Sequence, residues 1–242
     1  MTSKDKLENP EAFDERVAAL CDVYAQAAAL HAVGVHVVST DERTGMQALE
    51  RKHPTKPTRR GLVERVEFEY IRHGTLCLTA NFEIATGRIV TPRIAETRTN
   101  EDFLEHVQHT MAVDPDGQWI FVVDNLDAHK SEELVRYVAK QISHDSDLGV
   151  MSASGVLKSR ATRTAFLERT THRIRFVFTP RHCSWLNQVE LWFSVLTRRF
   201  LRRASFKSKE ELKERLCAFI KYFNAALAKP YRWTYTGRLL AA

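Results

Sequence analysis

The sequence of 242 residues lacks several features that mark specialised classes of protein. Its four cysteines, Cys21, Cys77, Cys183 and Cys217, form no CxxC pair, which argues against structural zinc and a disulfide framework and favours a reducing compartment. No apolar run approaches the roughly 18 residues of a membrane span, and the N-terminus leads into no signal-type core. No internal repeat is visible. We therefore expect an ordinary cytoplasmic globular protein with no membrane partner.

Charge of both signs is abundant, but basic residues are in excess. Lys and Arg number 36 against 30 Asp and Glu, so the formal net charge is +6. Eight of the eighteen residues from Arg198 to Arg215 are Lys or Arg, against three Glu. Such a stretch can bind a polyanion, and it can equally be a solvated helix face.

Hydrophobic periodicity in the first half predicts one helix followed by strands. Residues 11–31 have helical spacing, and residues 33–39 predict a buried strand that ends at residues 40–42. Residues 43–61, with two prolines and six basic residues, predict a loop. Alternation at residues 66–70 and 76–84 predicts half-buried antiparallel strands, then a hairpin turn at 85–88 and a strand near 88–95.

The middle of the chain predicts a central strand between two helices. Thr99 and Asp102 are typical of a helix start, and this helix should run to about Met111. Residues 119–123 form the most apolar strand, and Ser131 starts the next helix. Residues 143–164 are polar and lack a sustained period, so they predict an inserted loop.

The stretch 173–203 organises the rest of the chain. Residues 174–178 predict a strand, Ser184 an N-cap, and the apolar positions from Trp185 to Phe200 a helix with Glu190 at the margin of its buried face. Trp185 and Trp192 are expected in the core. A capped helix from Ser208 follows, and the aromatic tail 231–235 is available to dock on a partner. This order of elements predicts an α/β fold with a mixed β-sheet flanked by helices.

Three acids lie at the ends of hydrophobic elements, where ligand sites are common in α/β sheets. Asp41 and Asp124 follow strands, and if these strands are neighbours the two carboxylates lie about 5 Å apart. Such a pair repels unless one is protonated or a cation lies between them. With Glu190 they suit Mg²⁺, and a pair of ions can assist phosphoryl transfer. Taken singly, each acid is equally typical of a turn or a surface. A two-carboxylate glycosidase gains no support from the basic surface.

Three blocks around these acids, residues 39–51, 123–130 and 179–193, resemble the bacterial insertion-sequence transposases of the mariner-related branch of the DDE superfamily of endonucleases. The resemblance extends from about Val35 to near Gly237. It implies a ribonuclease H-like fold in which Asp41, Asp124 and Glu190 are the catalytic residues and the ligands of two Mg²⁺ or Mn²⁺ ions. It also implies cleavage of DNA at transposon ends, strand transfer into target DNA by the freed 3′-hydroxyl, and a homodimer in the bacterial cytoplasm at the nucleoid.

The same blocks contain four polar residues that could orient a carboxylate or contact DNA: Asn125, His129, His182 and Asn187. His182 could equally cap the turn after Pro180. Four arginines that close the predicted helix are expected to contact DNA: Arg198, Arg199, Arg202 and Arg203. We divide the chain into an N-terminal helical segment (1–34), the catalytic domain (35–205) and a C-terminal helix and tail (206–242).

Two departures from the family pattern bear on function. Asp124 and Glu190 are 66 positions apart (190 − 124), more than in mariner-type proteins, which leaves Asp145, Asp147 and Glu168 as weaker candidates for the third acid. About 34 residues precede the first strand, too few for the helix-turn-helix modules that bind transposon ends. We therefore expect a catalytic domain; the alternative is a non-catalytic DNA-binding or assembly subunit that modulates transposition.

Overall fold

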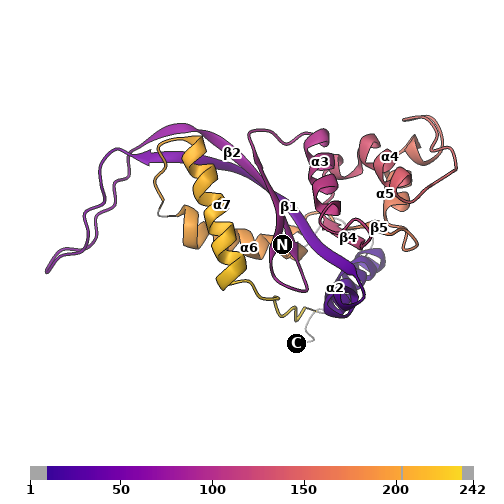
Figure 1. The fold of residues 1–242 in the computed structure, drawn as a ribbon, viewed down its shortest axis with the longest axis horizontal. Coiled ribbons are helices and arrows are strands. Elements are labelled where there is room, and N and C mark those ends of the chain that lie inside the picture. The colour runs from indigo at the N-terminus through magenta and orange to yellow at the C-terminus, as the bar shows by residue number, and fades with distance from the viewer. Residues whose placement is uncertain (1–9, 203, 236–242) are drawn as a thin grey trace.

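The computed structural model describes residues 10–202 and 204–235 (Figure 1). Within them the helices are α2 (Pro10–Ala32), α3 (Asn100–Met111), α4 (Glu132–Gln141), α5 (Arg160–Leu167), α6 (Val189–Leu196) and α7 (Lys209–Ala226). The strands are β1 (Val35–Arg51), β2 (Tyr70–Glu83), β3 (Ile89–Ala95), β4 (Gln118–Val123) and β5 (Ile174–Phe178). None of these helices is long and apolar enough to cross a membrane.

The strands form one mixed sheet, as the sequence predicts, and their order in it is β3-β2-β1-β4-β5. Strand β2 is antiparallel to β1 and β3, whereas β1, β4 and β5 run parallel. Strand β4 lies between two parallel neighbours and is buried on both faces, which explains why its sequence is a continuous apolar run. The connection from β1 to β4 contains α3, and the connection from β4 to β5 contains α4 and α5, which together cover one face of the sheet.

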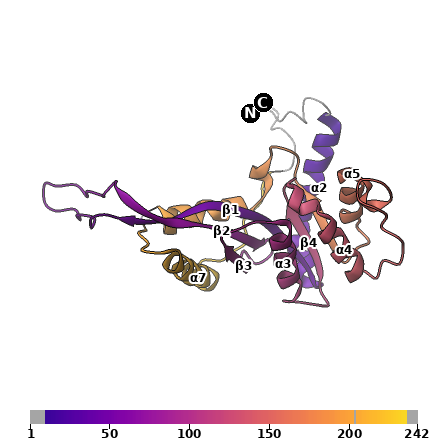
Figure 2. The ribbon, with the colours of Figure 1, turned by 90° about the horizontal axis from the view of Figure 1, so that it is seen from above.

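Alternate residues of β4 serve two separate cores. Ile120 and Val122 pack with α2, α6 and α7 on one face of the sheet. Trp119, Phe121 and Val123 pack with α3, α4 and α5 on the other. In Figures 1 and 2, α3, α4 and α5 gather at the β4–β5 end of the molecule, and α7 lies beside the long β1–β2 hairpin. The result is a three-layer arrangement around one sheet.

Three helices, α3, α4 and α7, begin at the caps that the sequence predicts. The Thr99 side chain accepts a hydrogen bond from the Asp102 N–H while Asp102 accepts one from the Thr99 N–H, a complete capping box. Ser131 caps α4 and Ser208 caps α7. The Glu211 carboxylate accepts a hydrogen bond from the Lys207 N–H, one residue before the cap, and not from the Ser208 N–H as in a complete capping box. Each side-chain cap contributes about 1 kcal/mol to the stability of its helix.

Strand β1 is much longer than its apolar run, so the loop predicted for residues 43–61 is wrong for residues 43–51. It continues to Arg51 and pairs with β2 as far as Tyr70. A shift in register between Arg43 and Met46 contains Gly45, whose φ of 69° suits a glycine. The β1–β2 hairpin extends away from the body as an arm (Figures 1 and 2). Polar residues are compatible with this strand because half of its surface faces solvent.

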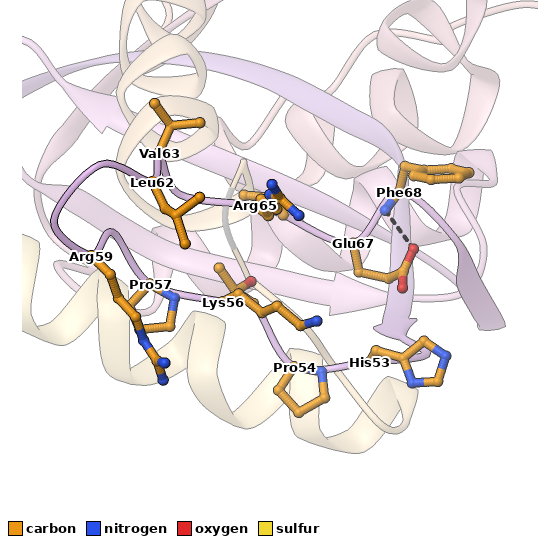
Figure 3. A pocket seen from close by; sticks show the side chains of 12 residues that line it. His53, Pro54, Lys56, Pro57, Arg59, Leu62, Val63, Arg65, Glu67 and Phe68 are labelled. Carbon is orange, nitrogen blue, oxygen red and sulfur yellow. Dashed lines mark hydrogen bonds between the residues drawn. The ribbon is translucent and has the colours of Figure 1, made fainter.

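Residues 52–69, which we call the arm tip, close the hairpin. A turn joins Arg59 to Leu62, and Lys56 pairs with Arg65. The strand predicted to begin at residue 66 is wrong, because β2 begins at Tyr70 and Phe68 is 82% exposed. The alternation fails here because the arm tip has no second layer on which to bury a face. Apolar and basic side chains surround its hollow of about 960 Å³ (Figure 3).

Two other expectations for helices and loops need correction. Helix α6 begins at Val189, not after Ser184, because residues 184–186 form a separate 3₁₀ turn with no side-chain cap. This turn leaves Trp185 52% exposed, so of the two tryptophans expected in the core only Trp192 is buried. The segment 143–164 is not all loop, since α5 begins at Arg160 with its own capping box from Ser159. Helix α5 has eight residues, too few for its period to stand out in the sequence.

The aromatic tail packs on its own chain. Tyr231 stacks on Phe82 of β2, and Trp233 packs edge-on against Tyr24 of α2. Tyr235 makes an edge-on contact with Trp185. The tail therefore ties the end of the described chain to the face of the sheet covered by α2.

Candidate active site

The parallel pairing of β1 with β4 places Asp41 beside Asp124. Ser39 pairs with Val122, and each aspartate lies two residues further along the chain from this pair. Strand β1 continues past this point in the hairpin, whereas β4 ends at Val123, so Asp124 lies in the loop that leaves the sheet. The expected neighbourhood of the two strands is confirmed, and it depends on the register alone.

Asp41 is the more buried of the two, with 8% of its surface exposed. Burial raises the pKa of Asp41, the hydrogen bond from the Glu42 N–H lowers it, and the negative charges of Asp124, Glu42 and Glu190 also raise it. Together these effects bring the pKa of Asp41 to about 7. The interaction with both other acids shows that the three carboxylates share one electrostatic environment. A positive charge placed among them would keep Asp41 ionised at neutral pH.

Asp124 has a protonated histidine as its partner. The Nδ1 of His129 lies 2.9 Å from Asp124 Oδ1, and its Nε2 lies 3.3 Å from Glu42 Oε1. Burial alone would lower the pKa of His129, but these two carboxylates more than offset it and raise the pKa to about 9. Burial likewise acts to raise the pKa of Asp124, yet the hydrogen bond and charge of His129 leave it below its usual value. At neutral pH Asp124 is therefore ionised.

Glu190 comes from the first turn of α6 and is half-buried. Burial raises the pKa of Glu190, the positive charge of Arg43 lowers it, and the charge of Asp124 raises it again. An acid in the first turn of a helix also interacts favourably with the helix dipole. The 66-residue separation in sequence thus does not keep Glu190 away from the two aspartates.

Asn187 joins β1 to the start of α6. Its Nδ2 donates to the carbonyl oxygen of Thr40 at 2.9 Å and to Asp41 Oδ2 at 3.3 Å, and its Oδ1 accepts from Ser39 Oγ. Ser39 Oγ in turn accepts from the N–H of Val189 at 2.8 Å. These bonds hold Asp41 and the first turn of α6 in one network, so Asn187 is placed to orient a carboxylate.

The other two polar residues of the matching blocks do not contact the acids in this way. Asn125 donates to the carbonyl oxygen of Thr179 and accepts from Lys130 Nζ at 2.6 Å, so it joins the ends of β4 and β5. His182 is exposed and has a φ of 59°, in the left-handed region that is unusual for a non-glycine residue.

The alternative acids lie elsewhere. Asp145 and Asp147 are exposed in the segment after α4, and Asp147 accepts from the Gly149 N–H. Burial raises the pKa of Glu168, and the charges of Arg16 and Lys130 lower it, which places this acid beside two cations. None of these three acids is among the charges that raise the pKa of Asp41.

Two residues next to Asp41 were not foreseen as part of the site. Glu42 holds His129, and Arg43 faces Glu190. Their only signal in the sequence is their adjacency to Asp41 at the end of an apolar run. The partner of Glu42 lies 87 positions away, which no local pattern can indicate.

Arg198 and Arg199 lie on a π-helical turn, Thr197–Leu201, and Arg202 follows this turn directly. The Arg202 N–H donates to the Thr197 carbonyl oxygen at 2.9 Å, and Arg198, Arg199 and Arg202 are exposed. Arg203 lies outside the described residues. The three described guanidinium groups are accessible to an anionic partner.

The donor set of the three acids fits a hard divalent cation. Carboxylate oxygens are the ligands that Mg²⁺ and Mn²⁺ prefer, and buried acids that raise each other's pKa need a positive counter-charge. Asp41, Asp124 and Glu190 are the residues that would hold such ions. Fold and site together define a ribonuclease H-like α/β domain with three acids at one edge of its sheet.

The family model of the DDE superfamily endonucleases matches residues 36–213, well over half of the chain. The chain belongs to this family, as the sequence blocks predict. No curated protein matches the chain in sequence.

Solved structures of a mariner transposase share the fold. A Mos1 mariner paired-end complex with Mn has a TM-score of 0.52 at 14% identity, with 92% of this chain and 57% of that chain covered. A Mos1 paired-end complex with the left transposon end gives 0.51 at 12%, covering 91% and 56%. A pre-cleavage Mos1 transpososome gives 0.52 at 11%, covering 88% and 56%. The chain thus spans a little more than half the length of these transposases.

Proposed function

We propose that this chain is a transposase catalytic domain that cleaves phosphodiester bonds at transposon ends and transfers the freed strand into target DNA. The observation that carries the proposal is the meeting of Asp41, Asp124 and Glu190, from two parallel strands and one helix, at one edge of a ribonuclease H-like sheet. The family, and the DNA-end complexes of the structurally similar proteins, support the same substrate class.

In this proposal the three acids hold two Mg²⁺ or Mn²⁺ ions, whose chemistry at such a site is activation of the nucleophile and of the leaving oxygen. A water oxygen bonds to the scissile phosphorus as the bond to the 3′-oxygen breaks. The freed 3′-oxygen then bonds to a phosphorus of the target strand as the bond from that phosphorus to the 3′-oxygen of its own strand breaks, and the proton of the attacking hydroxyl passes to the departing 3′-oxygen. His129 keeps Asp124 in place, Asn187 keeps Asp41 in place, and the exposed arginines after α6 bind DNA phosphates.

The test is calorimetric titration of Mg²⁺ and Mn²⁺, with and without duplex DNA, because DNA phosphates complete the coordination shell. We expect the wild type to bind, and the Asp41→Asn and Asp124→Asn variants to lose at least tenfold in affinity. Asparagine is nearly isosteric and neutral, so it suits a site whose burial already disfavours a charged Asp41. Asp145→Asn, at an exposed position, is the control that should bind like the wild type.

Unchanged binding in either variant, with folding verified by circular dichroism, would overturn the proposed site. The alternative, a non-catalytic DNA-binding or assembly subunit, would then be the better account of the basic surface after α6. A purely DNA-binding role requires no carboxylates at the sheet edge. The meeting of the three acids therefore favours the catalytic proposal.

We also propose that the protein works as a homodimer. The observation that supports this is the arm: six of the thirteen large hydrophobic side chains exposed among the described residues lie between Leu62 and Ile71. Such a patch on a projecting element is typical of a protein interface. The occupant that we propose is a second copy of this chain.

A further inference from the structure

A second cluster of possible ligands lies at the start of β1, where His36 precedes Asp41 by five residues. His31 Nε2, in the last turn of α2, is 3.5 Å from Glu83 Oε1, and His36 Nδ1, near the start of β1, is 2.8 Å from the same oxygen. All three ligand atoms lie within 4.8 Å of one another. Of the residues that the structure describes, these alone form such a group of three, so they are closer together than Asp41, Asp124 and Glu190.

The outer hydrogen bonds of the cluster suit a metal site. The Nε2 of His36 lies 3.1 Å from Asp114 Oδ2, so this nitrogen can carry the proton and leave Nδ1 free as a ligand. Metal-binding histidines usually donate their second ring N–H to a carboxylate in this manner. The second oxygen of Glu83 accepts from Thr86 Oγ1 at 2.6 Å, which leaves Oε1 directed at the histidines.

Packing fixes the His36 ring. Trp119 stacks on it with the ring centroids 4.2 Å apart and 17° between the planes. Asp114 is held by a turn, in which Gly117 N–H donates to Asp114 Oδ1 at 3.1 Å. A Cβ at Gly117 would lie 2.5 Å from Asp114 Oδ2, so a side chain at this position would displace the Asp114 carboxylate. The ligand geometry is therefore built into the fold and not left to mobile side chains.

From these contacts we propose that His31, His36 and Glu83 bind a divalent transition metal of the Zn²⁺ type, with Asp114 and Thr86 as outer partners. Two imidazole nitrogens and one carboxylate oxygen are a ligand set for Zn²⁺ with an open fourth position, whereas Mg²⁺ prefers oxygen. The His31 side chain is 38% exposed, so water can reach that position. The expectation against structural zinc was based on the spacing of the cysteines. This site contains no cysteine, so that spacing cannot indicate it.

The proposed role of this metal is structural. It would link the side chains at the end of α2, the start of β1 and the end of β2, in addition to the backbone pairing of Val38 with Glu83. His36 precedes Asp41 by five residues of strand, about 17 Å, so the metal would lie outside the candidate active site. The proposal does not depend on the proposed transposase function and survives its failure.

Zn²⁺ titration in excess Mg²⁺, which occupies the carboxylate site, tests the proposal, with calorimetry and the thermal unfolding midpoint as readouts. We expect one bound Zn²⁺ and a higher midpoint for the wild type. His31→Gln, at a half-exposed helix end, should fold normally, lose at least tenfold in Zn²⁺ affinity and lose the rise in midpoint. Asp114→Asn, which removes an outer partner, should lose about tenfold to hundredfold in affinity.

His73→Gln is the matched control, because His73 Nε2 lies 2.8 Å from Glu50 Oε2 in a histidine–carboxylate pair with no second histidine. It should bind Zn²⁺ like the wild type. Cys217→Ser, which removes the exposed thiol, should do the same. No Zn²⁺ binding by the wild type, equal binding by His31→Gln, or loss of binding in either control would overturn the proposal.

Discussion

Single buried histidines show how a partner decides the charge of a side chain. His129 has two carboxylate partners and a pKa raised to about 9. His106, in α3, is equally buried, and neither of its ring nitrogens has a hydrogen-bond partner among the described residues. Burial, together with the positive charges of Arg93, His109 and His129, lowers its pKa to about 3. His106 is therefore neutral in the folded protein.

This difference predicts a loss of stability in acid. Below a pH of about 6.5 the unfolded chain protonates His106 and the folded chain does not, so the free energy of unfolding falls with pH until about pH 3. The slope is up to about 1.4 kcal/mol for each pH unit. Between pH 7.5 and pH 5, His106→Leu should therefore lose about 2 kcal/mol less stability than the wild type.

Urea unfolding at the two pH values measures this effect. His53→Leu is the control, because His53 is exposed in the arm tip and is not among the charges that act on His106, so this variant should lose as much stability as the wild type. Equal losses of stability in the wild type and in His106→Leu would show that His106 takes up a proton in the folded state, contrary to the prediction.

Among single residues, the sequence indicates which acids form the site better than it indicates which side chains form hydrogen bonds with them. Asp41 and Asp124 could be paired in advance, because both follow apolar strands that run parallel. Asn187 and His129 could be named only through resemblance to a family, which named Asn125 and His182 equally. Hydrogen bonds between residues 87 and 146 positions apart distinguish the two groups. Only the fold determines such long-range contacts.

Elements differ in how well their ends can be predicted. Three helices with a side-chain cap begin where the sequence indicates, at Thr99, Ser131 and Ser208, whereas the short helix α5, capped by Ser159, was not predicted. Helix α6 has no such cap and begins five residues after the predicted Ser184. The length of β1 could not be predicted, because its second half is stabilised by pairing with β2 and not by an apolar pattern. Local signals thus predict elements whose stability is local.

The π-helical turn after α6 carries the prediction for DNA binding. Each arginine that contacts a phosphate should contribute about 0.9 to the slope of log affinity against log salt. Replacing Arg198, Arg199 and Arg202 together by Gln should therefore reduce the slope by up to about 3 and weaken binding similarly for all sequences. These residues are exposed, so folding should be unaffected.

Fluorescence anisotropy with a labelled duplex, across a range of salt concentrations, gives the slope. The control replaces Arg136, Lys140 and Lys158, which are exposed around α4 and α5 on the other face of the sheet, and removes the same charge. If both triple variants reduce the slope equally, net charge and not the turn after α6 drives binding.

On the scale of the whole molecule, the arm is the feature least explained by a single chain. The body buries its apolar side chains in two cores, yet the arm tip exposes Phe68 by 82% and Val63 by 78%. The basic residues of the arm tip would be sufficient for binding to DNA phosphates. Its large apolar side chains make no favourable contact with phosphates. Burial of each such side chain in an interface contributes about 1.5–3 kcal/mol, which makes a second protein surface the better partner.

The homodimer proposal therefore predicts that the arm controls oligomeric state. Sedimentation of the wild type should show a dimer that dissociates on dilution, and Val63→Ser with Phe68→Ser should raise the dissociation constant at least about tenfold. Val113→Ser with Val150→Ser removes two other exposed valines, 56% and 62% exposed, and should leave the dimer intact. A wild type that is monomeric at every concentration would exclude the homodimer. Equal dimerisation of all three proteins would place the interface away from the arm tip, since substitutions at such exposed positions change the stability of the monomer little.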